Sequence, residues 1–181
     1  LKEGPAEDSE HRESIAELLL FATSNKETHD VDQTLDDYIS RMPSDQKGIY
    51  YCVADTFEGA LNSPHLESLK SKNTEVLLLT DRIDEWLMSS LFEFKGKSFI
   101  NVAKTSNEAE VKPKTTKDQN EMLKKVANHL GDRVSEVLPS SRLKDSACCL
   151  VLQNNEPGIQ LRKILEAAGQ KMGDVVPIFE L

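Results

Sequence analysis

Cysteine, histidine and carboxylate side chains are the groups in this sequence that could carry out metal, nucleophilic or acid–base chemistry. The four histidines are His11, His29, His65 and His129, and none has a second histidine or a cysteine three or four residues further on. A metal site needs such ligands gathered at short spacing, so the pattern does not indicate one. Surface or capping roles are the ordinary interpretation of these histidines.

The three cysteines favour packing over redox chemistry. Cys52 lies within the apolar run "YYCVA", where a thiol is typically inert. Cys148 and Cys149 are adjacent, so on a strand they would point to opposite faces, and we expect one of them to be a small buried residue. The odd number and the lack of a C-x-x-C spacing argue against a disulfide framework and favour a reducing, cytoplasmic location.

Glycine and serine placement indicates neither a phosphate-binding loop nor a hydrolase nucleophile. A nucleotide site needs glycines directly after a strand, so that backbone N–H groups can approach phosphate, but Gly59 stands alone after the strand predicted at residues 48–55. No serine lies on a G-x-S-x-G turn. Asp84 and Glu85 are adjacent at a predicted helix start, where carboxylates complement the helix dipole; catalysis by this pair is the less favoured alternative.

Composition favours a soluble globular protein. The 181 residues carry a net charge of −9, with 38% hydrophobic and 29% charged residues. The acidic balance lacks the basic footprint of a nucleic-acid partner and opposes binding to anionic membranes. No apolar stretch approaches the ~18 residues of a membrane span.

Hydrophobic patterning predicts a small βαβαβ parallel-sheet unit preceded by helices, with right-handed crossovers. Ile15, Leu18, Leu19 and Ala22 form the apolar stripe of a first helix, and Thr34 with Asp37 resembles a capping box for a second. The predicted elements, in order, are helices at 7–25 and 33–42, a strand at 48–55, a segment at 57–72 that contains a helix capped by Ser63 with Pro64 at its first position, a strand at 74–81, a helix at 81–94 capped by Asp81, and a strand at 95–104.

The polar stretch 104–119 contains Pro113, lacks apolar periodicity, and is predicted to be a mobile hinge. We therefore predict an α/β part at 1–104, a linker at 105–117 and a second part, of α+β class, at 118–181. The second part should be a helix–three-strand–helix unit, with a helix at 119–130 ended by Gly131, strands at 133–138, 147–153 and 174–181, and a helix at 158–170.

Two apolar features could form a contact surface for other proteins. Trp86 is the only tryptophan and lies one turn into the helix predicted at 81–94. Leu161, Ile164 and Leu165 form a narrow stripe on the helix predicted at 158–170. The alternative is that Trp86 lies in the core and that the stripe packs on its own sheet.

Long blocks of this sequence resemble the heat shock protein 90 chaperone family, in the family's order. The blocks are "LKEGPAEDSEHRESIAELLLFATS", "LDDYISRMPSDQKGIYYCVAD", "SPHLESLKSKNTEVLLLTDRIDEWLMSSLFEFKGKSF" and "SRLKDSACCLV". The ending "AAGQKMGDVVPIFEL" is similar to the bacterial HtpG branch. The resemblance covers nearly the whole chain, and the "R-M-x-x-x-Q-K-x-I-Y-Y" and "E-V-L-L-L-x-D-x-I-D-E-W" blocks are specific.

The resemblance implies the end of a chaperone middle domain followed by the start of the C-terminal dimerisation domain. ATP and Mg would be bound by a domain before Leu1, as would the loop whose arginine completes hydrolysis, so no cofactor is expected in this chain. The pairing helices would follow Leu181, so the longer protein should be a homodimer and this chain a monomer.

By resemblance, non-native client proteins would contact Trp86 and the stripe Leu161, Ile164 and Leu165, although relatives often carry methionine in that stripe. Co-chaperones are further possible partners, whereas nucleic acid and membrane are not expected. Two alternatives remain open at this point: a small α/β ligand-binding or enzyme domain with a site in the sheet crevice, and a purely structural spacer.

Overall fold

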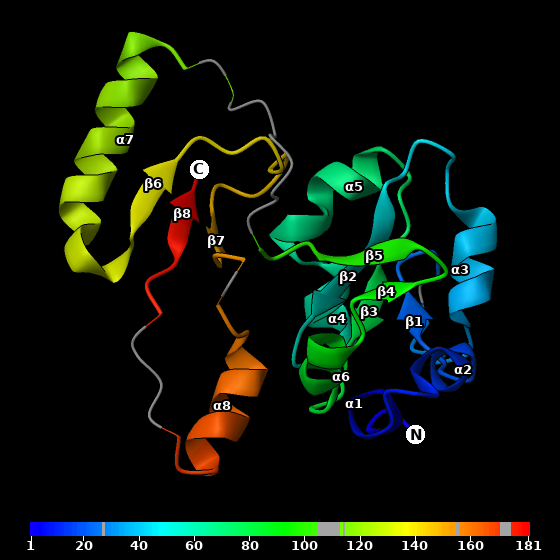
Figure 1. Cartoon of the computed structure of the whole chain (residues 1–181). Coiled ribbons are helices and arrows are strands. Elements are labelled where there is room, and N and C mark those ends of the chain that lie inside the picture. Colours follow the sequence, from blue (N-terminus) through cyan, green and yellow to red (C-terminus); the bar gives the residue numbers. More distant parts are fainter. Residues whose placement is uncertain (27, 105–112, 114, 155, 171–174) are drawn as a thin grey trace. The chain divides into compact units, whose positions relative to one another are not determined.

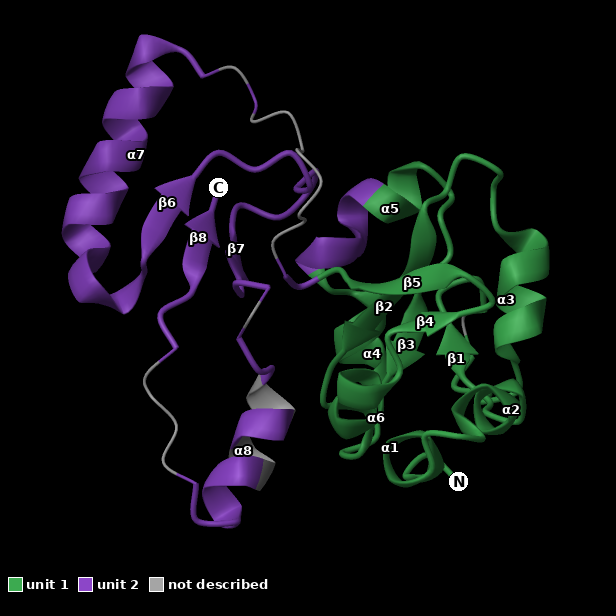
Figure 2. Cartoon of the chain, viewed as in Figure 1, with its two compact units in different colours: residues 1–63, 69–102 green, residues 64–68, 103–181 purple. Residues whose placement is uncertain are grey.

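The computed structural model describes residues 1–26, 28–104, 113, 115–154, 156–170 and 175–181, without the side chains of residues 159, 160, 163 and 164. It is a mixed α/β structure with two compact units (Figure 2). Unit 1 comprises Leu1–Ser63 and Leu69–Val102, and unit 2 comprises Pro64–Ser68 and Ala103–Leu181.

Unit 1 is built on a five-stranded sheet of order β1-β3-β2-β5-β4 (Figure 1). The central strand β2 (Gly48–Val53) runs parallel to β3 (Leu77–Leu79) and to β5 (Lys97–Asn101), as the predicted βαβαβ order requires. At the edges, β1 (Ala22–Thr23) pairs antiparallel with β3, and β4 (Glu93–Phe94) pairs antiparallel with β5. The sheet is therefore mixed, whereas the sequence predicted a parallel one.

In the described part of the chain, helical segments precede and separate these strands in the sequence. Their bounds are α1 Gly4–Glu7, α2 Arg12–Glu17, α3 Leu35–Arg41, α4 Phe57–Leu61, the 3-10 helix η1 Pro64–Leu66, α5 Glu67–Ser71 and α6 Asp84–Ser90. Of these, η1 and the first two residues of α5 belong to unit 2. The capping box predicted for α3 is present, since Thr34 and Asp37 each accept a hydrogen bond from the other's backbone N–H.

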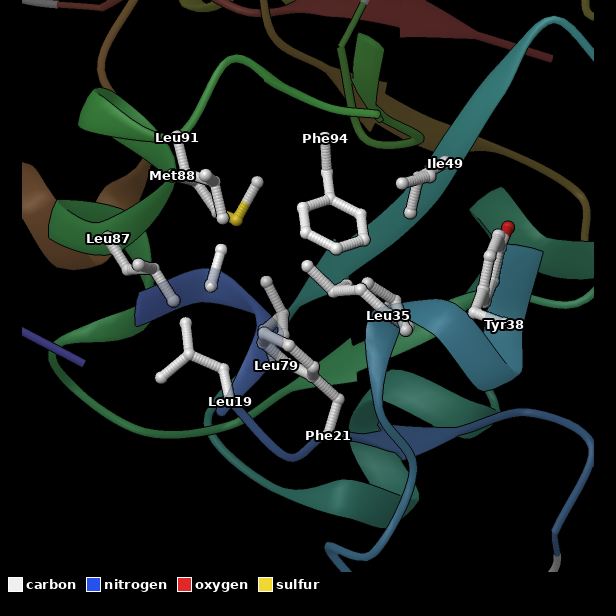
Figure 3. Packing of buried hydrophobic residues seen from close by; sticks show 12 residues of the cluster. Leu19, Phe21, Leu35, Tyr38, Ile49, Leu79, Leu87, Met88, Leu91 and Phe94 are labelled. Atoms are coloured by element: carbon white, nitrogen blue, oxygen red, sulfur yellow. The ribbon is translucent and has the colours of Figure 1, made fainter. Parts of the chain in front are cut away.

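The main core lies where α2, α3 and α6 meet one face of this sheet. Figure 3 shows Leu87 and Met88 of α6 pointing toward Leu19, Phe94 and Ile49. The fully buried members of the cluster include Ala16, Leu19, Phe21, Leu35, Tyr38, Ile49, Leu77, Leu79, Leu87, Leu91 and Phe94.

A buried polar network explains the spacing of the "R-M-x-x-x-Q-K-x-I-Y-Y" block. The Tyr38 hydroxyl donates to the Glu75 carbonyl at 2.7 Å and accepts from Gln46 Nε2 at 2.9 Å and from the Tyr50 N–H at 3.1 Å. Arg41, one turn after Tyr38, donates through Nη2 and Nε to the Glu75 carboxylate at 2.8 and 3.0 Å. The block thus ties α3 to β2 and to the residues before β3.

The helix predicted at 7–25 was wrong at both ends: Asp8–His11 are not helical, and α2 covers only Arg12–Glu17. Helix α2 ends at Glu17, the Phe21 N–H donates to the Gln33 carbonyl at 2.8 Å, and Ala22–Thr23 form edge strand β1. From Leu18 to Phe21 exposed and buried side chains alternate, which is the two-residue period of an extended chain. Leu18 was predicted to be part of the buried stripe, but it is 65% exposed. The free edge of β3 offers backbone hydrogen bonds that outweigh helix propensity here.

The helix predicted at 81–94 is also shorter, because its last residues turn back as strand β4. Lys95 and Gly96 have positive φ values of 47° and 74°, the signature of a tight hairpin between β4 and β5. The predicted cap was wrong as well: Asp81 does not cap α6, and instead Asp84 Oδ2 accepts from the Asp81 N–H at 2.9 Å.

Unit 2 contains a three-stranded sheet of order β6-β8-β7. Strand β6 (Glu136–Leu138) is parallel and β7 (Cys149–Val151) antiparallel to the central β8 (Ile178–Glu180). Besides η1 and the first two residues of α5, the described part of this unit contains the helices α7 Lys117–Leu130, η2 Gly131–Arg133 and α8 Ile159–Ala167. A capping box of Thr116 and Gln119 begins α7, and Gly131, with φ +54°, ends it as predicted.

The domain boundaries at 104 and 117 stay a prediction, and so does the hinge, since residues 105–112 and 114 lie outside the described part of the chain. On the described side, the Leu152 N–H donates to the Ala103 carbonyl at 3.0 Å, and Lys104 Nζ donates to the Glu156 carbonyl at 2.7 Å.

Candidate contact surfaces and their supports

Trp86 lies on α6 outside the stripe that packs into the core. The buried positions of this helix are Asp84, Leu87, Met88 and, just past its end, Leu91, which follow the i, i+3, i+4, i+7 spacing of one helix face. Trp86 falls off this face and is 40% exposed. The spacing of the apolar residues in the sequence already carried this signal, and it places the indole where another molecule can reach it.

Phe92 adds exposed aromatic area just beyond α6. Its side chain is 65% exposed, whereas the adjacent Leu91 and the nearby Phe94 are buried. The Phe92 carbonyl accepts from the Phe99 N–H at 3.0 Å, which fixes the backbone at this point. Phe92 was not predicted as an exposed residue, because the run "SSLFEF" falls in the helix predicted at 81–94.

Asp84 is a buried carboxylate, not the solvated dipole partner that its position at the helix start suggested. It has no exposed surface, and its Oδ1 accepts from Lys2 Nζ at 2.7 Å. Burial raises the pKa of Asp84, against the opposing effect of the Lys2 hydrogen bond and charge. Burial alone would lower the pKa of Lys2, but its hydrogen bonds to Asp81 and Asp84 outweigh that effect and raise it.

The stripe predicted on α8 is only partly described. Leu161 and Leu165 are half-buried, and the side chain of Ile164 lies outside the described residues. Arg162 Nε and Glu166 Oε1 form an ion pair at 3.0 Å, one turn apart on the same helix. Trp86 belongs to unit 1 and α8 to unit 2, so these are two separate candidate surfaces.

Glu67 organises a loop of unit 2 and was missed by sequence reasoning. Its carboxylate accepts from the Asp145 N–H at 2.9 Å, from the Lys144 N–H at 2.5 Å, from the Ser146 N–H at 3.1 Å and from the Ser146 hydroxyl. These bonds join two family blocks, "SPHLE" and "SRLKDSACCLV", that are separated by 77–79 positions. The Ser146 hydrogen bond, followed by the Lys144 and Asp145 backbone bonds, lowers the pKa of Glu67 to about 2.

This pKa shift predicts a specific acid sensitivity. Because the folded-state pKa of Glu67 is about 2 and its usual value is 4.5, its contribution to stability is complete above pH 4.5 and is lost as pH falls from 4.5 toward 2. The stability gap between the parent and Glu67→Gln should therefore close over that interval in melting curves. Glu121→Gln, on the exposed side of α7, is the control and should show no such gap. If the melting temperatures of Glu67→Gln and the parent differed by the same amount at every pH, the hydrogen bonds of Glu67 to residues 144–146, which we call the Glu67 clamp, would not stabilise the fold as described.

A second buried charge pair supports the sheet of unit 2. Arg142 Nε lies 3.0 Å from Glu180 Oε2 on β8, and the Ser140 hydroxyl donates to the same oxygen at 2.8 Å. His65 is part of this unit, and burial, with a smaller effect of the Arg142 charge, lowers its pKa to about 4. A neutral imidazole at physiological pH is thus a packing group here.

Two of the three thiols are buried. Burial raises the pKa of Cys52 and of Cys149 to about 11, so both are thiols at neutral pH, while Cys148 is exposed. Within the described residues, no three histidine, cysteine, aspartate or glutamate side chains converge where a metal ion could bind. None of the helices described is long and apolar enough to cross a bilayer.

Comparison with known proteins gives one consistent result. The family model described as "Hsp90 protein" matches residues 1–176. Proteins named "Chaperone protein HtpG" are similar over the whole chain: 43% identical over 190 residues in Nitrosococcus oceani, 44% over 190 in Aromatoleum aromaticum and 45% over 189 in Klebsiella pneumoniae. The chain spans 30%, 29% and 30% of the length of these relatives, respectively.

Proposed function

Since this chain belongs to the heat shock protein 90 family, we propose that it is a client-binding and coupling part of an ATP-dependent chaperone. It holds non-native proteins at an apolar surface and binds no nucleotide itself. The observation that carries this proposal is the position of Trp86, which is 40% exposed and lies outside the stripe that packs α6 into its core.

A chaperone must contact unfolded segments of varied sequence, so it needs apolar area that its own core leaves open. Tryptophan supplies large area with few rotatable bonds, which limits the entropy lost on contact. The 65% exposed Phe92 enlarges the aromatic area that the same part of unit 1 presents. We propose the α8 residues Leu161, Ile164 and Leu165 as a second client surface, on the strength of their spacing on one helix face.

The remaining parts of the proposal follow from the family. In the longer protein, ATP and Mg would act in a domain outside this chain, and dimerisation would use helices outside it, so this chain by itself is proposed to be a monomer without a cofactor. Its partners are non-native clients and co-chaperones, and its proposed location is the cytoplasm. The Glu67 clamp and the Arg142–Glu180 pair are proposed to keep unit 2 in one arrangement, as a coupling element requires.

One experiment separates this function from the alternatives. At micromolar concentration, the purified chain should suppress light scattering by a chemically unfolded protein diluted into buffer. It should neither turn over ATP nor gain thermal stability from any nucleotide. A clear nucleotide-dependent melting shift would favour a ligand site in the sheet crevice, and unchanged scattering at all concentrations would leave a structural spacer.

A further inference from the structure

We propose that Lys2 is a positioning residue for Trp86: its ammonium group, held between Asp81 and Asp84, fixes the first turn of α6 and with it the direction of the indole. This inference rests on the proposed role of Trp86 in client binding. Lys2 lies 79 and 82 positions away from its two partners in the sequence and belongs to a segment that is not itself part of the apolar surface.

The first turn of α6 is held by an unusual arrangement. Its N-cap residue, Ile83, supplies no side-chain hydrogen bond to the free N–H groups of the helix start. Asp84, the first residue of α6, instead uses both carboxylate oxygens to hold the turn 81–84 that leads into the helix: Oδ2 accepts from the Asp81 N–H at 2.9 Å, and Oδ1 accepts from Lys2 Nζ at 2.7 Å. Lys2 Nζ also lies 2.6 Å from Asp81 Oδ2, so one ammonium group joins both ends of this turn.

Because Asp84 is buried, the loss of its ion pair with Lys2 should disturb the start of α6. The Asp84 side chain is 1% exposed and that of Lys2 is 20% exposed, whereas Asp81 is 64% exposed. A buried carboxylate that loses its cation must either take up a proton or move to water. Movement to water would pull Asp84 out of the buried stripe and loosen the start of α6, two residues before Trp86.

The segment that carries Lys2 is held against α2, so Lys2 can hold Asp81 and Asp84 in place. We call residues Leu1–Glu7 the N-terminal strap. Arg12 Nε donates to the Pro5 carbonyl at 2.8 Å. A Cβ atom at Gly4 would lie 3.1 Å from Ile15 Cγ2, so the strap is packed closely on α2. Lys2 Nζ also lies 5.9 Å from the centre of the buried Phe21 ring.

The two ends of α6 are therefore anchored differently. Leu87, Met88 and Leu91 fix the later part by burial in the main core (Figure 3). The first turn depends on the polar contacts of Asp84 with Lys2 and the Asp81 N–H. Trp86 lies between these two anchors, two residues after Asp84. Loss of Lys2 should thus loosen Trp86 while the core side of the helix stays in place.

The test uses Trp86 itself as the reporter, because it is the only tryptophan. Lys2→Met keeps the length of the side chain and removes the charge; it should shift Trp86 emission to longer wavelength and increase its quenching by acrylamide. It should also weaken binding of an unfolded, tryptophan-free probe protein at least about fivefold, the loss of one typical interface contact. Lys2→Arg should restore emission and binding to nearly the parent values.

Two further variants test whether the effect of Lys2→Met comes from the unpaired Asp84 carboxylate. Lys2→Met with Asp84→Asn removes both charges, and it should bring Trp86 emission back toward the parent. Lys95→Met is the matched control, because Lys95 likewise bridges two carboxylates, with Nζ 2.7 Å from Asp36 Oδ1 and 3.2 Å from Glu17 Oε1, but lies outside α6. It should leave Trp86 emission unchanged.

Failure of this inference differs from failure of the proposed function. If Lys2→Met leaves both emission and quenching of Trp86 unchanged, Lys2 does not position it, whatever the binding result. If emission changes but probe binding does not, Lys2 positions Trp86 and the proposed client role of Trp86 is overturned. Native-state amide exchange at Glu85 and Trp86, faster in Lys2→Met than in the parent, supports the positioning role even where the variant melts early.

Discussion

Replacing Trp86 by alanine should weaken binding of a non-native protein at least about tenfold, while changing the free energy of unfolding by only about 1 kcal/mol or less. The indole is 40% exposed, and the core contacts of α6 come from Leu87, Met88 and Leu91. A residue outside the buried stripe contributes little to packing. At a contact surface, in contrast, a large aromatic side chain is the type whose truncation costs most.

Two controls define this result. Leu87→Ala, one residue further on and fully buried, should cost about 2–5 kcal/mol of stability because it leaves a cavity in the core. Val31→Ala removes a 53% exposed apolar side chain elsewhere in unit 1 and should change neither quantity. Denaturant melts and fluorescence anisotropy of a labelled unfolded protein measure the two effects. If Trp86→Ala lost stability as Leu87→Ala does and kept its affinity, Trp86 would be an ordinary packing residue.

Tyr38→Phe should destabilise unit 1 by about 2–4 kcal/mol, since each buried group left without its partner costs about 1–3 kcal/mol. The hydroxyl of Tyr38 is hydrogen-bonded to the Glu75 carbonyl, to Gln46 Nε2 and to the Tyr50 N–H, and the residue is 1% exposed.

Burial raises the pKa of Tyr38 to about 12, although its hydrogen bonds with Tyr50 and Gln46 oppose this. The folded state therefore keeps the proton longer than the unfolded chain, and stability falls as pH rises from 10 toward 12.

Tyr51→Phe is the matched control, because it removes the same hydroxyl group from a tyrosine of β2, the strand to which Tyr38 is hydrogen-bonded through the Tyr50 N–H. The Tyr51 hydroxyl has a side-chain hydrogen bond with Asn101, and we expect its loss to cost about 1 kcal/mol. Urea melts at pH 7 should rank Tyr38→Phe well below Tyr51→Phe in stability. Equal effects of the two substitutions would show that the Tyr38 network does not hold α3 on the sheet.

The pattern of apolar residues was sufficient to predict those helices and strands that are long enough to show a hydrophobic period. Strands β2, β3 and β5 and helix α7 fall inside the ranges predicted for them or extend them by two residues. The two-residue strands β1 and β4 were missed, because strands that short have no period of their own and exist only through pairing with β3 and β5. In both places the preceding helix was extended over residues that belong to the sheet edge.

The supports of the candidate site were hidden for a different reason. Lys2, Glu67 and Arg142 act through ion pairs or hydrogen bonds to residues 82, 77–79 and 38 positions away. Charge patterns within a single helix or strand cannot indicate such partners. Asp84 was misinterpreted because a carboxylate at a helix start is normally solvated, and only the strap that covers it shows otherwise. For Trp86 the prediction left core and surface open, although the spacing of residues 84, 87, 88 and 91 puts it off the buried stripe.

In the proposed function Trp86 contacts non-native protein, and its own fluorescence emission reports that contact. Titration of the chain with an unfolded, tryptophan-free protein should move Trp86 emission to shorter wavelength and reduce acrylamide quenching, with the same midpoint as binding measured by anisotropy of the labelled probe. Burial of an exposed indole against an apolar partner requires both changes. Saturable binding by anisotropy with no change in Trp86 emission or quenching would contradict the claim and place the client elsewhere on the chain.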